Sequence, residues 1–368
     1  MRFPEFTGEW MKCKFGEIAT GFDYGMNAAA KPYDGQNKYI RITDIDEVSS
    51  TYNNSSIVSP DGILSENYVV NEGDILLART GASTGKSYLY RKSDGKLYYA
   101  GFLIRANVAE HNPYFVFSQL HTHRYWRWVS IMSARSGQPG INSLEYASFP
   151  IFTTTLKEEN KISSLLSLID KRIATQNKII DKLQSLIKGI RNDVFGKLRK
   201  DIGLNAKVGD VLSYEQPQPY IVEDTEYTAG GTPVLTANKA FVLGYTSETD
   251  GIYDKGDCII FDDFTLDCKY VDFPFKVKSS AIKILTAKNK ELLRYTFEFL
   301  KYLDLSTDEH KRHYIAETQN QEFILPTTQI VRTIAHAFST LSSRMQTIVK
   351  QRDMLELQKQ YLLRQMFI

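Results

Sequence analysis

The chain carries the same apolar heptad seam twice, and this repeat constrains its fold more than any other feature. The first seam steps by alternating four and three residues through Ile162, Leu166, Ile169, Ile173, Gln176, Ile180, Leu183, Ile187, Ile190 and Val194. Adding 172 to each number gives the second seam, Ile334, Phe338, Leu341, Met345, Ile348, Arg352, Leu355, Lys359, Leu362 and Met366. This is the spacing of coiled-coil a and d positions. It predicts two helices of about 33 residues, or roughly 50 Å each.

The place of the two seams in the chain predicts how the helices pack. The order is a globular stretch (1–155), a helix (156–200), a second globular stretch (201–325) and a second helix (326–368). An apolar stripe has to be buried, and the matching stripe on the other helix is its natural partner. Antiparallel packing then gives each globular domain its own end of the helix pair, related by a pseudo-two-fold axis. The alternative is that each helix packs only onto its own domain.

Charge is segregated along the chain, although the total is only +2. Residues 156–200 hold 11 Lys and Arg against 5 Asp and Glu, whereas residues 201–325 hold 13 against 21. DNA binding would therefore depend on local patches or on a partner. No apolar run is long enough for a bilayer and the N-terminus lacks a signal-peptide pattern, which predicts a cytoplasmic protein without a membrane partner. Cys13, Cys258 and Cys268 form no CxxC pair, so we expect neither disulfides nor a zinc ribbon.

Each globular stretch is predicted to be mixed α/β, and the two share short segments. "KFGEI" (14–18) matches "KVGDV" (207–211), and Gly73-Asp74-Ile75 matches Gly256-Asp257-Cys258. Runs such as "KYIRITDI", "DILLAR", "DCIIFDDF" and "VDFPFKVK" favour strands. One shorter helix is expected per half. In the first half it has Asn112 as N-cap and Pro113 at its first position, and in the second half it lies in "NKELLRYTFEFLKYL".

The segment "GDILLARTGASTGKSYLY" (73–90) looks at first like a phosphate-binding loop. A P-loop needs four residues between its first glycine and the Gly-Lys pair, but Gly81 and Gly85 enclose only three. It must also open into a helix, whereas β-formers follow Lys86 as far as Asp94-Gly95, a hairpin signal. The spacing therefore favours strand, turn and strand, with glycines that allow a sharp turn. A P-loop ATPase stays as a rival that loss of ATP binding in Lys86→Ala would support.

Several further segments occur in order along the chain: the opening Arg2 to Phe6 with Trp10, then "KFGEI", "GDILLARTGASTGKS", "SGQPGIN" (136–142) and the helix entry "FPIFTTTLKEENKI". With the duplication and the two seams, the chain resembles the DNA specificity subunits of type I restriction-modification systems over essentially its whole length. The second half departs from the first. It has acids in "GDCIIFDDFTLDCKY" where the first half has Arg79 and Lys86, and "EHKRHYIAETQNQ" stands in place of "SGQPGIN".

The resemblance implies an α/β (α+β) fold of two target recognition domains separated by two long antiparallel coiled-coil helices. Each domain would read one half of a bipartite target in double-stranded DNA, and the helices would set the spacer. It also implies a subunit without catalysis or a cofactor of its own, whose partners are two methyltransferase subunits and the ATP-dependent restriction subunits. S-adenosylmethionine and ATP would bind to those partners. A coiled-coil scaffold with protein-binding ends is the alternative.

Candidate DNA contacts are basic and amide side chains on loops, because Arg and Lys pair with guanine and Asn and Gln with adenine. They are Lys31, Arg41, Arg79, Ser83, Thr84, Lys86, Arg135 and Gln138 in the first half, and Asn238, Lys239, Lys269, Lys311, Arg312 and His313 in the second. Tyr98, Tyr99 and Phe102 are expected to pack rather than to stack on bases.

Other clusters have simpler explanations than a catalytic or metal site. Asp262, Asp263 and Asp267 with Lys269 suggest a nuclease site, but a hairpin with solvent-facing acids is favoured. His121-x-His123 and His310-x-x-His313 lack further ligands, so surface or base-contact roles outrank zinc. Basic residues outside the first seam would track DNA phosphates, meet the methyltransferase or simply be solvated: Lys171, Arg172, Lys178, Lys182, Lys188 and Arg191.

Overall fold

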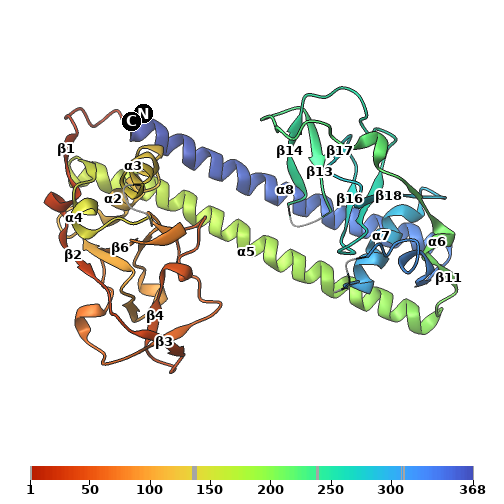
Figure 1. Cartoon of the computed structure of the whole chain (residues 1–368), viewed down its shortest axis with the longest axis horizontal. Helices are drawn as coiled ribbons and strands as arrows, with labels where there is room; N and C mark the ends of the chain where they lie inside the picture. The colour runs from red at the N-terminus through yellow and green to blue at the C-terminus, as the bar shows by residue number, and fades with distance from the viewer. Residues whose placement is uncertain (1, 135–138, 238–239, 308, 310, 368) are drawn as a thin grey trace. The chain divides into compact units, whose positions relative to one another are not determined.

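The computed structural model describes residues 2–134, 139–237, 240–307, 309 and 311–367. The chain divides into two compact units, residues 1–175 with 351–368 (unit 1) and residues 176–350 (unit 2). Each unit contains one globular domain and one part of each of two long helices, α5 (Leu156–Asp201) and α8 (Thr328–Met366). Figure 1 draws α5 in yellow-green and α8 in blue.

The first domain is built on an antiparallel sheet in the order β2 (Thr20–Tyr24), β9 (Leu103–Asn107), β6 (Asp74–Ala78) and β7 (Ser87–Leu89). Side chains of β6 alternate between two cores. Ile75 and Leu77 join a core with α2 (Pro113–Gln119) and the start of α5, whereas Leu76 and Ala78 face a second core on the other side. Asn112 caps α2 as expected, because its side chain accepts from the amides of Tyr114 and Phe115.

The remaining strands of the first domain form small sheets: β1 (Met11–Lys14) with β10 (Pro150–Thr153), β3 (Ala29–Pro32) with β5 (Val58–Asp61), and β4 (Lys38–Ile40) parallel with β8 (Leu97–Tyr99). Its other helices are α1 (Phe15–Ile18), α3 (His123–Ser133) and α4 (Ser143–Ala147). The hairpin predicted at Asp94-Gly95 is wrong, since β8 pairs with β4 rather than with β7. The chain crosses there from one sheet to another.

The second domain repeats this plan. Its main antiparallel sheet has the order β12 (Leu212–Glu215), β18 (Ile282–Ala287), β15 (Cys258–Asp262) and β16 (Cys268–Val271). Short β11 (Ala206–Lys207) pairs with β19 (Glu322–Phe323), and β13 (Thr232–Leu235) lies between β14 (Val242–Thr246) and a parallel partner, β17 (Lys276–Val277). The helices are α6 (Val208–Val211) and α7 (Leu292–Leu303). This confirms two mixed α/β domains of one duplicated topology.

The matching segments "KFGEI" and "KVGDV" occupy the same place in the two domains, as α1 and α6. The acid of each segment accepts the preceding lysine amide, Lys14 to Glu17 at 2.9 Å and Lys207 to Asp210 at 2.8 Å. A Cβ on Gly16 would lie 3.0 Å from Ala147, and one on Gly209 would lie 3.0 Å from the Gln319 carbonyl. A close approach of the next segment therefore favours glycine at both positions.

The two long helices pair through the predicted seams. Every seam position is buried or half-buried. In unit 1 the start of α5 shares a core with the end of α8, Ile162 and Leu166 with Leu362 and Phe367. In unit 2 the end of α5 packs with the start of α8, where Phe195 and Val331 share a core. The helices therefore run antiparallel, and each also packs onto a domain.

The helices have 46 and 39 residues, which exceeds the length of about 33 taken from the seams but lies close to the predicted segments 156–200 and 326–368. α5 begins six residues before its seam, since Thr154 and the acids Glu158 and Glu159 build its first turn. The polar seam residue Lys359 pairs with Asp170 of α5 at 2.6 Å. Within the described part of the chain, no helix combines the length and apolar character needed to cross a bilayer.

Candidate nucleic-acid interface

The connection between β6 and β7 is the turn predicted at residues 79–86, with a short 3-10 turn at Gly81–Ser83 and no helix after Lys86. Gly81 and Gly85 have φ of 67° and 92°, which other residues rarely adopt. A Cβ on Gly85 would lie 2.7 Å from Val129 of α3, so this glycine is needed for packing as well. Strand, turn and strand follow one another as the spacing predicted.

Hydroxyl groups of buried Tyr and Thr side chains form hydrogen bonds with the backbone of this loop. Tyr146 donates to the Ala78 carbonyl at 2.6 Å and accepts from the Gly85 amide at 3.1 Å, while Tyr125 donates to the Gly85 carbonyl at 2.8 Å. Thr84 is buried, and its hydroxyl donates to the Gly81 carbonyl at 2.8 Å. Thr84 was predicted to contact DNA, but its side chain is committed to the turn. The neighbouring Ser83 is half-buried.

Three of the basic residues predicted to contact DNA in the first domain are paired with carboxylates. Lys86 contacts Glu47 at 2.8 Å with 17% of its side chain exposed, and Lys31 lies 4.0 Å from Asp61. Arg41 binds the Asp44 carboxylate with two nitrogens, at 2.9 and 2.8 Å, and this pairing raises its pKa. These pairs reduce the positive field that the residues present to a ligand.

Arg79 differs from these residues because it forms no ion pair with the described residues. Its guanidinium lies over the Tyr24 ring, 4.8 Å from the centroid. The Tyr24 hydroxyl accepts from the Ser143 amide at 3.2 Å. The Ser143 side chain, this amide hydrogen bond and the nearby Arg79 charge lower the pKa of Tyr24. Arg79 also lines an open hollow of about 260 Å³, together with Thr80, Met132, Gly140, Ile141, Asn142 and Glu145.

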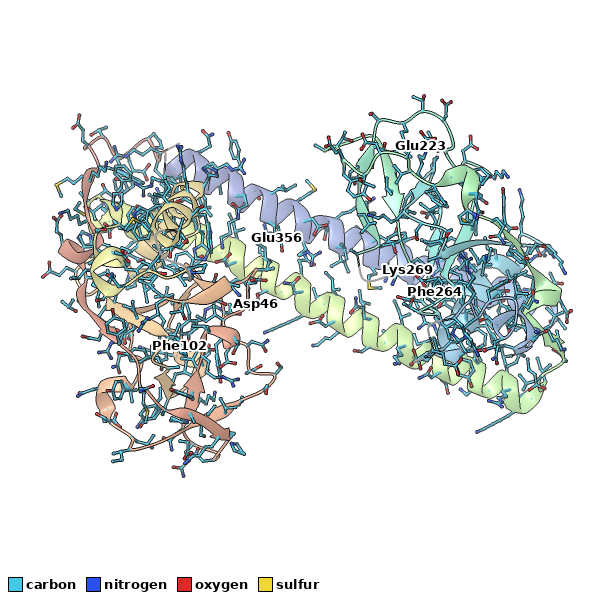
Figure 2. All side chains as sticks on the ribbon, viewed as in Figure 1. Asp46, Phe102, Glu223, Phe264, Lys269 and Glu356 are labelled. Atoms are coloured by element: carbon cyan, nitrogen blue, oxygen red, sulfur yellow. The ribbon has the colours of Figure 1, made fainter. Side chains whose placement is uncertain are left out.

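An exposed aromatic residue adjoins Arg79. Phe102 lies in the turn between β8 and β9, labelled in Figure 2, with 58% of its surface exposed. Its carbonyl accepts from the Arg79 amide at 3.0 Å. The expectation that Phe102 packs inside the domain is wrong, whereas Tyr98 and Tyr99 are buried as expected. Alternation along "KLYYAGFL" does not reveal that the chain turns back at Gly101, which exposes the next side chain.

Arg135, Gln138, Asn238 and Lys239 lie outside the described residues. In the second domain, Lys269 contacts Asp267 at 3.4 Å, and Lys311 pairs with Glu309 and Glu317. Arg312 is half exposed and lies 3.8 Å from Asp263. His313 does not face solvent, since its side chain is buried and binds Glu317 at 2.9 Å, which raises its pKa. The base contact predicted for His313 is therefore replaced by a supporting role in its loop.

The acidic cluster of the second domain is structural. β15 and β16 form the predicted hairpin, but Asp262 and Asp263 are buried rather than solvent-facing. Asp262 caps the turn through the amides of Phe264 and Thr265. Asp263 accepts from the amides of His313 and Tyr314 at 3.0 and 2.7 Å. The described residues contain no group of three His, Cys, Asp or Glu side chains suited to a metal ion.

Backbone hydrogen bonds show that Asp263 stands where Arg79 stands in the first domain. The Arg79 amide donates to the Phe102 carbonyl, and the Asp263 amide donates to the Ala281 carbonyl at 2.8 Å. The Arg79 carbonyl accepts from Ile141, and the Asp263 carbonyl accepts from His313, both at 3.0 Å. The same backbone position therefore carries a cation in one domain and a buried anion in the other.

The structure also tests the surface positions predicted for His121 and for the basic residues of α5 outside the seam. His121 is half-buried rather than at the surface. Its ring nitrogens lie 3.0 Å from the Phe117 carbonyl and 3.0 Å from the Ser50 hydroxyl, and burial with the nearby Lys359 lowers its pKa to about 4. Of the basic residues outside the first seam, Lys171, Arg172, Lys178, Lys182 and Lys188 are exposed. Arg191 is instead largely buried and binds Glu298 of α7 at 2.7 Å.

Comparison with known proteins finds a family match in the first half of the chain. Residues 8–185 match the family model of the type I restriction modification DNA specificity domain. The specificity subunit of the Escherichia coli type I restriction enzyme EcoR124I/EcoR124II is 45% identical over 126 residues, which cover 32% of this chain and 31% of the relative. The match thus spans about a third of that curated protein's length.

Solved structures show the same fold over nearly the whole chain. The S subunit of a type I restriction-modification system from M. genitalium has a TM-score of 0.63 at 15% identity, covering 96% of this chain and 95% of its own. A chain from a structural study of type I R-M complex assembly has a TM-score of 0.50 at 13% identity, covering 96% of both chains. At these identities the likeness concerns the fold.

Proposed function

The chain belongs, through residues 8–185, to the family of type I restriction-modification DNA specificity domains, and from this premise we propose that it is a sequence-specific DNA-binding subunit. Each globular domain reads one half of a bipartite target in double-stranded DNA. The chain has no catalytic role of its own and determines where catalytic partners act.

The duplicated sheet is the observation that carries this proposal. The sheet order β2-β9-β6-β7 of the first domain corresponds to β12-β18-β15-β16 of the second. In each domain a short helix, α1 or α6, precedes the first strand of this sheet. They differ in the segments that leave the end of the central strand, where Arg79 in one domain corresponds to Asp263 in the other. Two domains that share one sheet topology but differ in their loop side chains would each recognise a different DNA sequence.

We also propose the partners. The chain assembles with two methyltransferase subunits and with restriction subunits, which bind S-adenosylmethionine and ATP. The E. coli relative is named as the specificity subunit of a restriction enzyme, which supports an assembly of this kind. Exposed basic residues along α5, outside the buried seam, leave a polar helix surface for DNA phosphates or for a methyltransferase subunit.

Fluorescence anisotropy with the methyltransferase subunits present tests this function. A library of duplexes first identifies the preferred bipartite sequence, and the preferred duplex is then compared with a scrambled duplex of equal length and composition at the same salt concentration. The specific duplex should bind on the order of 10³-fold more tightly or better. Equal affinity for both duplexes would support the coiled-coil scaffold instead.

The spacer is set by the helices in this proposal, because α5 and α8 are single helices that each contribute residues to both units. One heptad inserted into each helix adds about 10.5 Å, or roughly three base pairs of DNA. The insertion keeps the seam in phase. Sequencing of methylated adenines should then report both half-sites unchanged and a longer gap between them. An unchanged gap would contradict the role of the helices.

A further inference from the structure

Arg79 stands out among the predicted contacts because its guanidinium forms no ion pair with any residue that the structure describes. Of the predicted basic residues that the structure describes, Lys31, Lys86, Lys269 and Lys311 have carboxylate partners within ion-pair distance, as do the two other arginines, Arg41 and Arg312. The Arg79 guanidinium has none among the described residues and contacts an aromatic ring instead. Within the described part of the chain, its nitrogens therefore have no carboxylate that would compete with an external acceptor.

The Arg79 backbone is fixed on both sides. Its amide donates to the Phe102 carbonyl and its carbonyl accepts from the Ile141 amide, each at 3.0 Å. The side chain then lies over Tyr24, whose hydroxyl is held by the Ser143 amide. Three segments of the first domain, at Tyr24, at Phe102 and at residues 141–143, thus determine where the guanidinium points. An arginine held in this way loses less side-chain entropy on binding than a free one.

The surroundings of Arg79 suit a base edge better than a phosphate alone. The hollow beside it is lined by Asn142 and by Glu145, whose carboxylate accepts from the Asn142 amide at 2.8 Å. Phe102, whose carbonyl accepts from the Arg79 amide, adds an exposed apolar surface nearby. Phosphate contacts need charge but little geometry, whereas a guanine offers N7 and O6 to a correctly oriented guanidinium fork.

We propose that Arg79 is a specificity-determining residue that reads a guanine, through N7 and O6 in the major groove, in the half-site bound by the first domain. This inference rests on the proposed DNA-binding function. The second domain supplies an internal contrast. At the same backbone position it has Asp263, which is buried against the amides of His313 and Tyr314. The guanine contact therefore belongs to one half-site only.

The test uses the full chain with its methyltransferase subunits and the preferred duplex, in which each guanine of either half-site is replaced in turn by 7-deazaguanine. This base lacks the N7 acceptor but still pairs with cytosine. One guanine, in one half-site, should show a loss of affinity of about tenfold. Arg79→Ala should bind the unmodified duplex about five- to 150-fold more weakly, with no further loss from 7-deazaguanine at that position.

Arg91→Ala is the matched control. Arg91 is exposed in the same domain and follows Leu89, which pairs with Ile75 at the other end of β6. This variant loses the same charge but should keep the 7-deazaguanine effect of the wild type. Arg79→Lys retains the charge without the fork, so it should bind the unmodified duplex more weakly than wild type and show a smaller 7-deazaguanine effect. Circular dichroism and the elution volume of the complex check that each variant is folded and assembled.

Two results would overturn the inference while leaving the proposed function intact. One is a 7-deazaguanine penalty that persists in Arg79→Ala. The other is a uniform loss across all duplexes with a salt dependence reduced by about one ion, which is the behaviour of a phosphate contact. Wild-type complex that binds specific and scrambled duplexes equally would instead contradict the proposed function itself.

Discussion

The two domains share a sheet but are connected to the long helices in different ways. In unit 2, Glu298 of α7 is 1% exposed and accepts from Arg191 of α5 and Arg294 of its own helix. Arg294 also donates to the Phe338 carbonyl and to Ser342 of α8. In unit 1 the corresponding junction joins Tyr114 of α2, Asp170 of α5 and Lys359 of α8.

The difference between these junctions lies in their burial. Asp170 and Lys359 keep 27% and 22% of their side chains exposed, whereas the unit 2 arginines keep 13% and their shared carboxylate almost nothing. Water compensates for a broken pair far better when the partners are partly exposed. The domain of unit 2 is therefore joined to the long helices by a buried charge network, and the domain of unit 1 by a partly exposed polar cluster.

The largest expected effect comes from Glu298→Ala. It leaves two largely buried arginines facing each other without a carboxylate, which should cost unit 2 about 3–5 kcal/mol. Asp170→Ala should cost unit 1 less, about 1–2 kcal/mol. Peptide-level hydrogen exchange measures the two units separately. Glu291→Ala removes the exposed pair with Arg332 as a control and should cost less than about 1 kcal/mol. Equal losses for Glu298→Ala and Asp170→Ala would remove the distinction between the junctions.

The sequence predicted the long helices, their pairing and the turn between β6 and β7. The heptad seams predicted both long helices and their antiparallel pairing, because a period of seven residues leaves a single apolar stripe to bury. It also predicted the strand, turn and strand at residues 73–90 from the spacing of Gly81 and Gly85. The family resemblance is confirmed over residues 8–185. These are features that local spacing determines.

Burial and register at single residues could not be predicted. Matching Gly73-Asp74-Ile75 with Gly256-Asp257-Cys258 pairs Arg79 with Asp262, one residue from its structural counterpart Asp263. The cores show that the sequence match is one residue out of register. Ile75 corresponds to Ile259, because both lie in the core that faces the helices, whereas Cys258 lies in the core on the other side of its sheet. Long-range contacts likewise decide that Asp263 is buried and that His121 and Arg191 are half-buried. Polarity alone suggested solvent for each.

Two histidines should make the stability of the two units respond to pH in opposite directions, an effect of intermediate size among those predicted. Burial holds the pKa of His121 at about 4 in unit 1, below the unfolded value of about 6.5. Protons therefore bind more readily to the unfolded chain, and the stability of unit 1 should fall as pH decreases from 6.5 toward 4. Between pH 7 and 5.5 the loss is about 1 kcal/mol. The pKa of His313 in unit 2 is raised by Glu317, so its contribution is present below pH 6.5 and lost as pH rises through the folded value.

Hydrogen exchange at the two pH values, corrected for intrinsic rates, should show this opposite response. His121→Gln keeps a polar side chain without the titration and should flatten the response of unit 1 alone. Glu317→Gln removes the carboxylate that raises the pKa of His313 and should affect unit 2 alone. The same pH response in both units, unchanged by either substitution, would show that the two histidines do not distinguish them.

The smallest expected effect concerns Phe102, which has no aromatic counterpart, because Ala281 occupies its position in the second domain. An exposed phenyl ring beside Arg79 suits the methyl group of a thymine in the same half-site. Replacing that thymine by deoxyuridine removes one methyl and should cost about 0.8 kcal/mol, or roughly fourfold in affinity. Phe102→Ala should bind both duplexes equally, while Phe273→Ala, an exposed aromatic of the second domain, should preserve the discrimination. If Phe102→Ala still distinguished thymine from deoxyuridine, the exposed ring would have no part in reading, and the difference between the domains at this edge would reduce to Arg79 and Asp263.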